Sequence, residues 1–386
     1  MIESRFIEKL LKNREIEFKS LGDVTEMKRG KTITAKDASG GDIPVISGGQ
    51  KPAYYHNEYN RNGKTITVAG SGAYAGFIMY WEEPIFVSDA FSIKSDETLL
   101  DLKYVYHFLL QHQQKIYGMK KGSGVPHVYP KDLSTLVIPI PPLDVQQEIV
   151  RILDAFTSLT AELTAELTSR QKQYQYFRDK LLNFDDISDR GGYETNSITK
   201  ALLHNKKVVF KALGNISENL DFMRKPITSG LREKGNIPYY GASGIVDYVK
   251  DYIFEGDYLL VSEDGANLLA RNTPIAFSIS GKNWVNNHAH VLKFNTYTER
   301  RFVEFYLNNI DLTPYISGAS QPKLNKNNLS NIKIPAPPFE EQQRIVTILD
   351  KFETLTNSIA EGLPKEIELR RKQYEYYREK LLSFSQ

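Results

Sequence analysis

The side chains best able to do chemistry in this chain are basic and aromatic residues in turn-like segments. The first group is Lys28, Arg29, Lys31, Lys51, Arg61 and Lys64, with Tyr54 and Tyr55 between them. The second group is Arg224, Lys225, Arg232, Lys234, Arg271 and Lys282, with Tyr239 and Tyr240 between them. Cations of this kind contact phosphates, and Arg also reads base edges. We predict DNA-binding surfaces, although for any single residue a solvated surface charge is the simpler reading.

Two glycine-bearing loops extend this set. Residues 122–128 read GSGVPHV and residues 318–325 read GASQPKLN, in corresponding places of the two halves of the chain. Glycine lets a backbone approach a ligand closely, so His127, Gln321 and Lys323 join the predicted DNA-binding residues. A purely structural turn is an equally good reading of both loops.

Catalytic and metal-binding signatures are absent from the sequence. Residues 70–76, GSGAYAG, have the wrong spacing for a dinucleotide loop, and there is no GxxxxGK[ST] phosphate loop. The chain lacks the Asn/Asp-Pro-Pro-aromatic tetrapeptide with which amino-methylating DNA methyltransferases hold a base, and it has no cysteine. His288 and His290 have no third ligand nearby in the sequence. We therefore predict no catalytic residue, no metal site and no cofactor.

The chain contains a long internal repeat. Residues 138–156 and 334–352 are identical at 12 of 19 positions, and residues 172–184 and 372–384 at 9 of 13. Upstream of these tails the similarity fades but keeps its order. The repeat predicts that the two similar tails have the same role. It also predicts that the two divergent blocks perform one kind of task on two different targets.

The tails have the apolar spacing of long helices. Ile149, Ile152, Phe156, Leu159 and Leu163 step by three and four, and residues 345–359 repeat the pattern. About 40 helical residues make a rod of roughly 60 Å, so we expect two long antiparallel coiled-coil helices. Two amphipathic helices packed only on their own domains would explain the period but not the length. Gly362 and Pro364 predict a break in the second helix.

The blocks predict mixed, strand-rich domains. Strands are expected at 64–69, 84–93, 258–262 and 275–279, and short helices at 102–110 and 301–307. The predicted fold class is α/β, with two pseudo-repeated domains joined by the two long helices. The domain limits that follow are residues 1–142 and 192–338 for the blocks, and 143–191 and 339–386 for the helices.

The charge balance limits the possible partners. The 386 residues include 49 basic and 47 acidic side chains, a net charge of +2, which argues against a polybasic binder but leaves a locally basic DNA-binding face possible. No apolar run is long enough to cross a membrane. Glu3, Glu8, Glu15 and Glu17 do not suit a signal peptide. We predict a cytoplasmic protein without a membrane partner.

The duplicated layout, the IPxPPxxxQQxIVxILDxF tails, the QPKLN loop and the KQYxYxRxKLLxF ends resemble the specificity subunit of a type I restriction-modification system. The resemblance implies two target recognition domains joined by two antiparallel helices and no catalytic activity. It also implies partners: a bipartite asymmetric site on double-stranded DNA, two modification (methyltransferase) subunits and, in some systems, restriction subunits. Two alternatives remain open, namely a coiled-coil protein adaptor and a self-contained methyltransferase or nuclease with unrecognised motifs.

One detail of the first tail concerns the distance between half-sites. Residues 160–163 and 164–167 both read TAEL, at the point where the heptad steps change. The simpler reading is that TAEL is good helix-forming sequence. We predict that adding a third copy would lengthen the unspecified spacer of the DNA site by one base pair.

Overall fold

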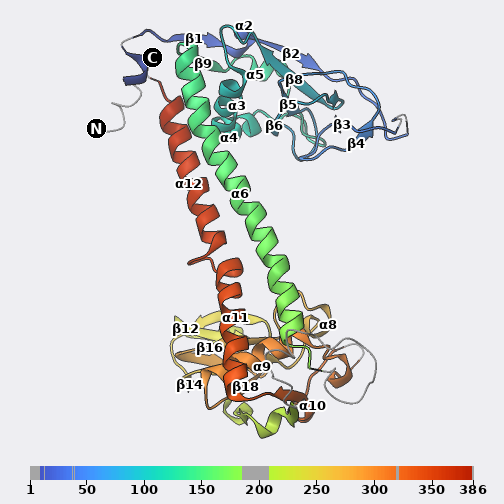
Figure 1. The fold of residues 1–386 in the computed structure, drawn as a ribbon, viewed down its shortest axis with the longest axis vertical. Helices are drawn as coiled ribbons and strands as arrows, with labels where there is room; N and C mark the ends of the chain where they lie inside the picture. Colours follow the sequence, from blue (N-terminus) through green and yellow to red (C-terminus); the bar gives the residue numbers. More distant parts are fainter. Residues whose placement is uncertain are drawn as a thin grey trace. The chain divides into compact units, whose positions relative to one another are not determined.

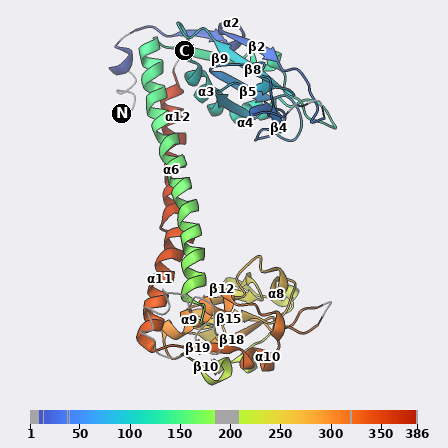
Figure 2. The ribbon, with the colours of Figure 1, turned by 45° about the vertical axis from the view of Figure 1, so that its right-hand side comes forward.

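The computed structural model describes residues 9–12, 14–36, 38, 40–184, 208–318 and 321–384 (Figures 1 and 2). The chain divides into two units, one formed by Met1–Ala165 with Lys365–Gln386 and the other by Glu166–Pro364. Each unit therefore contains one strand-rich domain and parts of both tails. No helix among the described residues is long and apolar enough to cross a membrane.

The domain of the first unit is built on an antiparallel sheet with the strand order β2-β8-β5-β6. Its strands are β2 (Thr25–Arg29), β8 (Ala90–Ser95), β5 (Thr65–Ala69) and β6 (Ile78–Trp81). A smaller sheet has the order β4-β3-β7. Its strands are β4 (Tyr54–His56), β3 (Ile43–Ile46) and β7 (Phe86–Val87). The strand predicted at 64–69 is confirmed as β5, every residue of which is buried.

The single strand predicted at 84–93 is wrong in one respect, because the segment forms two strands in different sheets. Between β7 and β8, the Ser88 hydroxyl accepts a hydrogen bond from the Ile33 backbone N–H at 3.3 Å. The Asp89 carbonyl accepts one from the Gly70 N–H at 3.1 Å. These contacts at Ser88 and Asp89 turn the chain from one sheet into the other.

Short helices complete the core of the first domain. They are α2 (Leu21–Val24), α3 (Leu102–Gln111), α4 (Gln113–Gly118) and α5 (Pro130–Leu133). The helix predicted at 102–110 is confirmed as α3, which begins where the Asp101 carboxylate accepts hydrogen bonds from the backbone N–H groups of Lys103 and Tyr104. Tyr104, Val105 and Leu109 of α3 are fully buried beside Ile66 and Val68 of β5.

The domain of the second unit repeats this plan. One four-stranded sheet has the order β11-β18-β15-β16, and a second four-stranded sheet has the order β13-β12-β17-β14. The strands are β11 (Glu218–Asn219), β18 (Ala289–Lys293), β15 (Tyr258–Ser262), β16 (Ala276–Ile279), β13 (Gly244–Val249), β12 (Lys234–Gly241), β17 (Lys282–Val285) and β14 (Phe254–Glu255). The β12–β17 pair is parallel, as is the β3–β7 pair of the first domain. The fold therefore confirms that the blocks are copies of one domain.

The helices of the second domain also correspond. They are α8 (Asn267–Ala270), α9 (Tyr297–Asn309) and α10 (Lys326–Asn331), with 3-10 turns η2 (Leu213–Asn215), η3 (Asp221–Met223), η4 (Ser229–Leu231) and η5 (Thr313–Tyr315). The helix predicted at 301–307 is confirmed but begins earlier, because the Thr296 side chain accepts a hydrogen bond from the Glu299 N–H at 3.1 Å and caps α9.

A two-stranded sheet closes each domain at its junction with a long helix. In the first domain β1 (Glu17–Ser20) pairs antiparallel with β9 (Val137–Ile140), and in the second β10 (Val209–Ala212) pairs with β19 (Lys333–Ala336). The glutamine that follows is also shared. Gln146 Nε2 donates to the Pro141 carbonyl at 2.7 Å, and Gln342 Nε2 donates to the Pro337 carbonyl at 2.9 Å. The chain therefore enters and leaves each domain through two neighbouring strands, β1 and β9 in the first domain and β10 and β19 in the second.

The first tail is one continuous helix, α6 (Leu143–Leu181), whereas the second is divided into α11 (Phe339–Asn357) and α12 (Leu363–Leu382). The predicted break is confirmed. Gly362 adopts φ +86°, and a Cβ at this position would collide with the Thr354 carbonyl oxygen.

The long helices pair antiparallel within each unit. In the first unit, α6 begins and α12 ends in the same core, which contains Ile149 and Leu381, and Phe156 stacks on Tyr377 at 5.2 Å. In the second unit, α11 begins and α6 ends in one core, and Phe177 stacks on Phe352 at 5.7 Å. Each domain core is therefore completed by the last turn of a helix that comes from the other tail.

An aspartate of the repeated ILDxF sequence fixes each domain to its long helix. Asp154 accepts a hydrogen bond from Lys103 Nζ at 2.9 Å and lies 2.9 Å from His107 Nε2. Asp350 accepts hydrogen bonds from Tyr297 Oη at 2.8 Å and Arg301 Nε at 3.0 Å. Burial alone would raise the pKa of Asp154, but the contacts with His107 and Lys103 hold it below its ordinary value. The carboxylate thus stays ionised and holds α3 against α6.

Candidate nucleic-acid interface

The two glycine-bearing loops form equivalent hairpins. Lys121 and His127 exchange backbone hydrogen bonds of 2.9 and 2.8 Å, and Ser317 and Lys323 do the same at 2.9 and 2.8 Å. The residue after each hairpin then bonds to the end of the central strand. The Val128 N–H donates to the Gly70 carbonyl at 3.0 Å, and the Leu324 N–H donates to the Glu263 carbonyl at 2.8 Å. His127 therefore corresponds to Lys323, and Gly70 corresponds to Glu263.

Strand register extends the correspondence to the neighbouring strands. Ala69 pairs with Ala90 in β8, as Ser262 pairs with Ala289 in β18, so Phe91 corresponds to His290. Met27 pairs with Ile93, as Asn219 pairs with Leu292. Two residues further along the chain, Arg29 corresponds to Asp221. An equivalent site therefore lies in each domain, at the ends of the central strands and beside the hairpin. It is defined by four matched pairs: Arg29 with Asp221, Gly70 with Glu263, Phe91 with His290, and His127 with Lys323.

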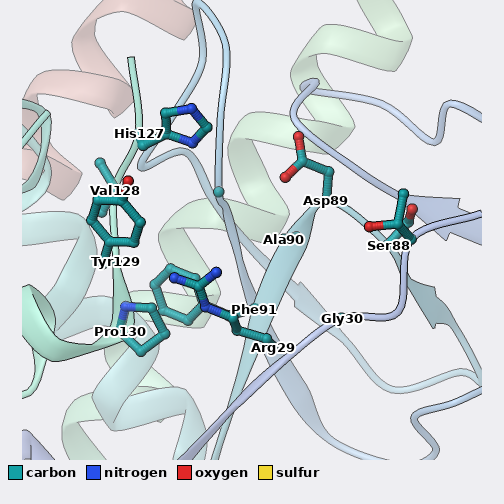
Figure 3. A pocket seen from close by; sticks show the side chains of 12 residues that line it. Arg29, Gly30, Ser88, Asp89, Ala90, Phe91, His127, Val128, Tyr129 and Pro130 are labelled. Carbon is teal, nitrogen blue, oxygen red and sulfur yellow. The ribbon is translucent and has the colours of Figure 1, made fainter. Parts of the chain in front are cut away.

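In the first domain this site is an open hollow of about 110 Å³ (Figure 3). The hollow is lined by Arg29, Asp89 and His127 among other residues. Tyr129 and His127 lie on one side of the view, and Asp89 and Ser88 on the other. Gly30 forms part of the wall, and a Cβ there would collide with the Ser88 carbonyl oxygen. Glycine at this position therefore lets the chain pass close to the strand end.

The Tyr129 ring lies close to Arg29 of the hollow and to the neighbouring Lys131. The Arg29 guanidinium carbon lies 5.3 Å from the centroid of the Tyr129 ring, and Lys131 Nζ lies 5.9 Å from it. The His127 ring stacks on Tyr129 at 5.9 Å with an interplanar angle of 17°. Attraction between a cation and an aromatic face stabilises such an arrangement without using the hydrogen-bond donors of the cation. The Arg29 donors have no hydrogen-bond or ion-pair partner among the residues that the structure describes.

In the second domain the equivalent site is filled by an ion network. Arg224 donates to Glu263 Oε2 at 2.6 Å, and Lys323 Nζ lies 3.1 Å from Glu263 Oε1. The buried His290 ring has Nε2 2.7 Å from the Leu324 carbonyl and Nδ1 2.6 Å from Asp221 Oδ2. Burial alone would raise the pKa values of Asp221 and Glu263, but contacts with His290 and Arg224, respectively, hold both below their ordinary values. The carboxylates are thus ionised and matched by neighbouring cations.

Asp221, Glu263 and His290 bring ligand atoms within 4.8 Å of one another, which is close enough to hold a metal ion. The donor set does not favour one, because Arg224 and Lys323 already contact the carboxylates and both nitrogens of His290 face acceptors. The polar atoms that would ligate a metal are therefore already occupied by contacts within the protein. His288 does not join this cluster, since its Nδ1 lies 2.9 Å from both carboxylate oxygens of Asp264.

Apart from the half-buried His127, which lines the hollow of the first domain, the predicted DNA-binding residues fall into two groups, and the side chains of the first group lie at the surface. Its members are Lys28, Arg29, Lys31, Lys51, Lys64, Lys225, Lys234, Lys282, Gln321 and Lys323, all exposed. Lys28 and Lys64 form surface ion pairs with Glu26 and Glu97. Such exposed pairs contribute roughly 0–1 kcal/mol, so they leave both amines accessible to a phosphate.

The second group is engaged by the fold. Arg61 donates to Ser92 Oγ at 2.7 Å and to the Arg29 carbonyl at 3.0 Å. Arg232 donates to Asp247 at 3.0 Å. Arg271 donates to the Leu307 and Ile310 carbonyls at the end of α9, and Arg224 belongs to the ion network described above. These guanidinium groups hold loops and strand ends in place, so a structural role accounts for them.

Sequence reasoning missed the residues that distinguish the two sites. In the first domain these are Asp89 and Tyr129, and in the second Asp221 and Glu263. Tyr129 follows His127 by two residues, and aligning the two copies through the QPKLN loop would have placed it opposite Asn325. Asp221 and Glu263 lie 42 positions apart in the sequence (263 − 221), and no local pattern connects them.

Comparison with known proteins identifies relatives along nearly the whole chain. The family described as "Type I restriction modification DNA specificity domain" matches residues 13–170 and 205–369. The specificity subunit of the Escherichia coli type I restriction enzyme EcoR124I/EcoR124II is 32% identical over 436 residues, which cover 100% of this chain and 98% of that protein. A Haemophilus influenzae protein assigned as a type I restriction enzyme specificity subunit is 33% identical over 407 residues, with 98% of each chain covered.

A solved structure shares the fold. The S subunit of a type I restriction-modification system from M. genitalium superposes with a TM-score of 0.67 at 19% identity, covering 97% of this chain and 98% of the other. At that level of identity the likeness concerns the fold alone. Two copies of the domain and the two tails are thus a shared architecture.

Proposed function

This chain belongs to the type I restriction modification DNA specificity family, and from that premise we propose that it is the non-catalytic specificity subunit of a type I restriction-modification complex. It reads a bipartite, asymmetric site on double-stranded DNA, with one domain on each half-site. It docks two modification subunits and, where the system has them, restriction subunits. The protein acts in the cytoplasm.

One observation carries the proposal. The sheets β2-β8-β5-β6 and β11-β18-β15-β16 correspond strand for strand, yet the equivalent sites beside the hairpins hold different residues, with Arg29 opposite Asp221 and His127 opposite Lys323. A duplicated enzyme would be expected to keep its reacting groups in at least one copy of the site. A duplicated reader of two different sequences has reason to change its contact residues while keeping the frame that holds them.

The domain limits proposed for this function are residues 1–142 and 192–338 for recognition, with 143–191 and 339–386 as the helices. The β1–β9 and β10–β19 pairs support them, because each closes its domain immediately before a long helix. Residues 185–191 of the first helical segment lie outside the described residues.

The exposed lysines are the proposed phosphate contacts of each domain. Lys28, Lys31, Lys51 and Lys64 serve the first domain, and Lys225, Lys234 and Lys282 serve the second, in which Lys323 is paired with Glu263. Each neutralised phosphate releases condensed counterions, so binding should weaken steeply with salt. The structural roles of Arg61, Arg224, Arg232 and Arg271 remove them from this set.

The test is reconstitution with a modification subunit and selection from a random-sequence DNA library. We expect the chain to assemble with the modification subunit and the complex to retain DNA with two fixed half-sites separated by an unspecified spacer. Assembly without sequence preference would instead favour a protein adaptor. Methyl transfer from S-adenosylmethionine, or DNA cleavage, by the chain alone would favour a self-contained enzyme.

A further inference from the structure

The hollow of the first domain offers a donor and an acceptor that are both free to bind. The Arg29 guanidinium lies over Tyr129 and has no hydrogen-bond or ion-pair partner among the described residues. Asp89 lines the same hollow, and the Ser71 hydroxyl donates to its Oδ2. Arg29 and Asp89 form no ion pair with each other among the described residues. The guanidinium and the carboxylate therefore both remain available to a ligand in the hollow.

We propose that this hollow reads a G·C base pair in the half-site of the first domain, with Arg29 as the residue that determines specificity. Arg29 donates to guanine O6 and N7, and Asp89 accepts from the N4 amino group of the paired cytosine. This inference rests on the proposed function, because it assigns one base pair within the DNA site that the complex reads.

The chemistry of the two side chains selects this ligand. In the major groove guanine presents two acceptors, O6 and N7, and cytosine presents one donor, N4. An arginine fork matches the first and a carboxylate matches the second. A phosphate would suit Arg29 but would be repelled by Asp89. A hollow with both groups therefore fits a base-pair edge better than the DNA backbone.

The arrangement is also oriented before any ligand binds. The contact with Tyr129 holds the guanidinium carbon 5.3 Å from the ring centroid, and the Ser71 hydroxyl donates a hydrogen bond to one oxygen of Asp89. Groups that are held in their binding orientation lose less conformational entropy on association. The equivalent position in the second domain cannot do the same, because Asp221 stands in place of Arg29 and lies 2.6 Å from His290.

The experiment compares complexes of the modification subunit with the unaltered chain or with Arg29→Ala, Arg29→Lys and Asp89→Ala, each selected on a randomised DNA library. The unaltered complex should prefer guanine over other bases at one position of one half-site by about 5- to 150-fold. Arg29→Ala should reduce that preference to less than about threefold, and Asp89→Ala should weaken it at the same position. The other half-site and the spacer should not change.

Arg29→Lys and the neighbouring Lys31→Ala are the controls. Lysine keeps the charge but not the planar fork, so Arg29→Lys should lose most of the base preference while keeping the salt dependence of binding. Lys31→Ala should leave the base preference intact. The salt dependence should then fall by about one unit of slope if Lys31 contacts a phosphate.

Several outcomes would overturn the inference. They are a first half-site without a G·C position, an unchanged motif in Arg29→Ala, and a uniform loss of affinity that lysine restores, which would make Arg29 a phosphate contact. Each of these leaves the proposed function standing, because the unaltered complex still selects a bipartite site. Failure of the unaltered complex to select any sequence would instead contradict the proposed function.

Discussion

The equivalent sites of the two domains have the same backbone frame but differ in their side chains, which leave one site open and fill the other with ion pairs. In the first domain the hairpin, the central strand and the start of the neighbouring loop surround an open hollow with unpaired charges at Arg29 and Asp89. In the second domain the same elements enclose Asp221 and Glu263, whose charges are matched by Arg224 and Lys323, and the His290 ring lies beside both carboxylates. One site is free to bind, whereas the other holds its own loops together.

The difference shows how a duplicated domain can diverge without losing its fold. The backbone hydrogen bonds of the hairpin are shared, so the frame does not depend on which side chains point into it. Charged side chains can then serve either recognition or stability. Unpaired charges at a surface favour recognition, and paired charges in a buried place favour the fold only while every partner is present.

The largest effect should come from breaking the network of the second domain. Asp221→Ala removes the buried carboxylate that lies 2.6 Å from His290 Nδ1 and 3.4 Å from Arg224, and it leaves Glu263 to balance the charge of the network. We expect this change to destabilise the second domain by about 3 kcal/mol. Arg29→Ala at the equivalent position of the first domain should change stability by less than about 0.5 kcal/mol, because this side chain is exposed. Urea unfolding followed by hydrogen exchange of each domain measures both changes. Equal effects at the two positions would refute the comparison.

The next effect concerns the exposed lysines of each domain. Replacing Lys225, Lys234 and Lys282 by alanine should lower the slope of log affinity against log salt by up to about three units, since each lost phosphate contact removes about 0.9. Replacing Lys28, Lys31 and Lys51 is the matched experiment in the first domain. Both sets should leave the selected bases unchanged. A slope that does not change in either set would mean that the DNA-binding face lies elsewhere.

Acid should affect the two hairpins differently. Asp221 and Glu263 have pKa values lowered by folding, so their contribution to stability is present above the ordinary values of 3.8 and 4.5 and is lost as the pH falls through the folded values. Glu304 has a raised pKa and opposes this trend, so the measurement must be local. Hydrogen exchange, corrected for the intrinsic rate, should increase below about pH 4 for residues 321–332 more than for residues 121–133. A larger increase in 121–133 would contradict the account.

The smallest change expected is in spacer length. A third TAEL after Leu167 adds four residues to α6, which lengthens the helix by about 6 Å and turns it by about 40° beyond a full revolution. One base pair of B-DNA turns by about 35° and rises by about 3.4 Å. The spacer should lengthen by one base pair with both half-sites unchanged, as mapping of methylated sites would reveal. Replacing residues 164–167 by a different helix-forming tetrapeptide is the control and should leave the spacer as it was.

Much of the fold follows from local sequence patterns. The three- and four-residue steps of residues 149–163 predicted α6, and Gly362 and Pro364 predicted the division of the second tail. The β-branched residues at 64–69 predicted β5. The segment at 84–93 failed as one strand, because the contacts that turn the chain at Ser88 and Asp89 come from Ile33 and Gly70, which are distant in sequence.

The candidate site was harder to predict for a physical reason. A sequence shows that Arg224 is basic but not that Glu263 and three backbone carbonyls will accept hydrogen bonds from it. The same holds for Arg61 and Arg271, because the backbone carbonyls that accept their hydrogen bonds carry no sequence signal. Arg29 differs, because it lies beside the Tyr129 ring, which accepts none of the hydrogen bonds that the guanidinium can donate.

The most direct test of the central claim, that each domain reads its own half-site, is a domain exchange at the limits that the structure provides. Residues 17–140, closed by the β1–β9 pair, would be replaced by the corresponding segment of the E. coli EcoR124I/EcoR124II specificity subunit, and methylated sites would be mapped across the genome of cells that also carry the modification subunit. We predict that one half of the methylated sequence changes while the other half and the spacer length are retained. A change in both halves, or in neither, would contradict the claim.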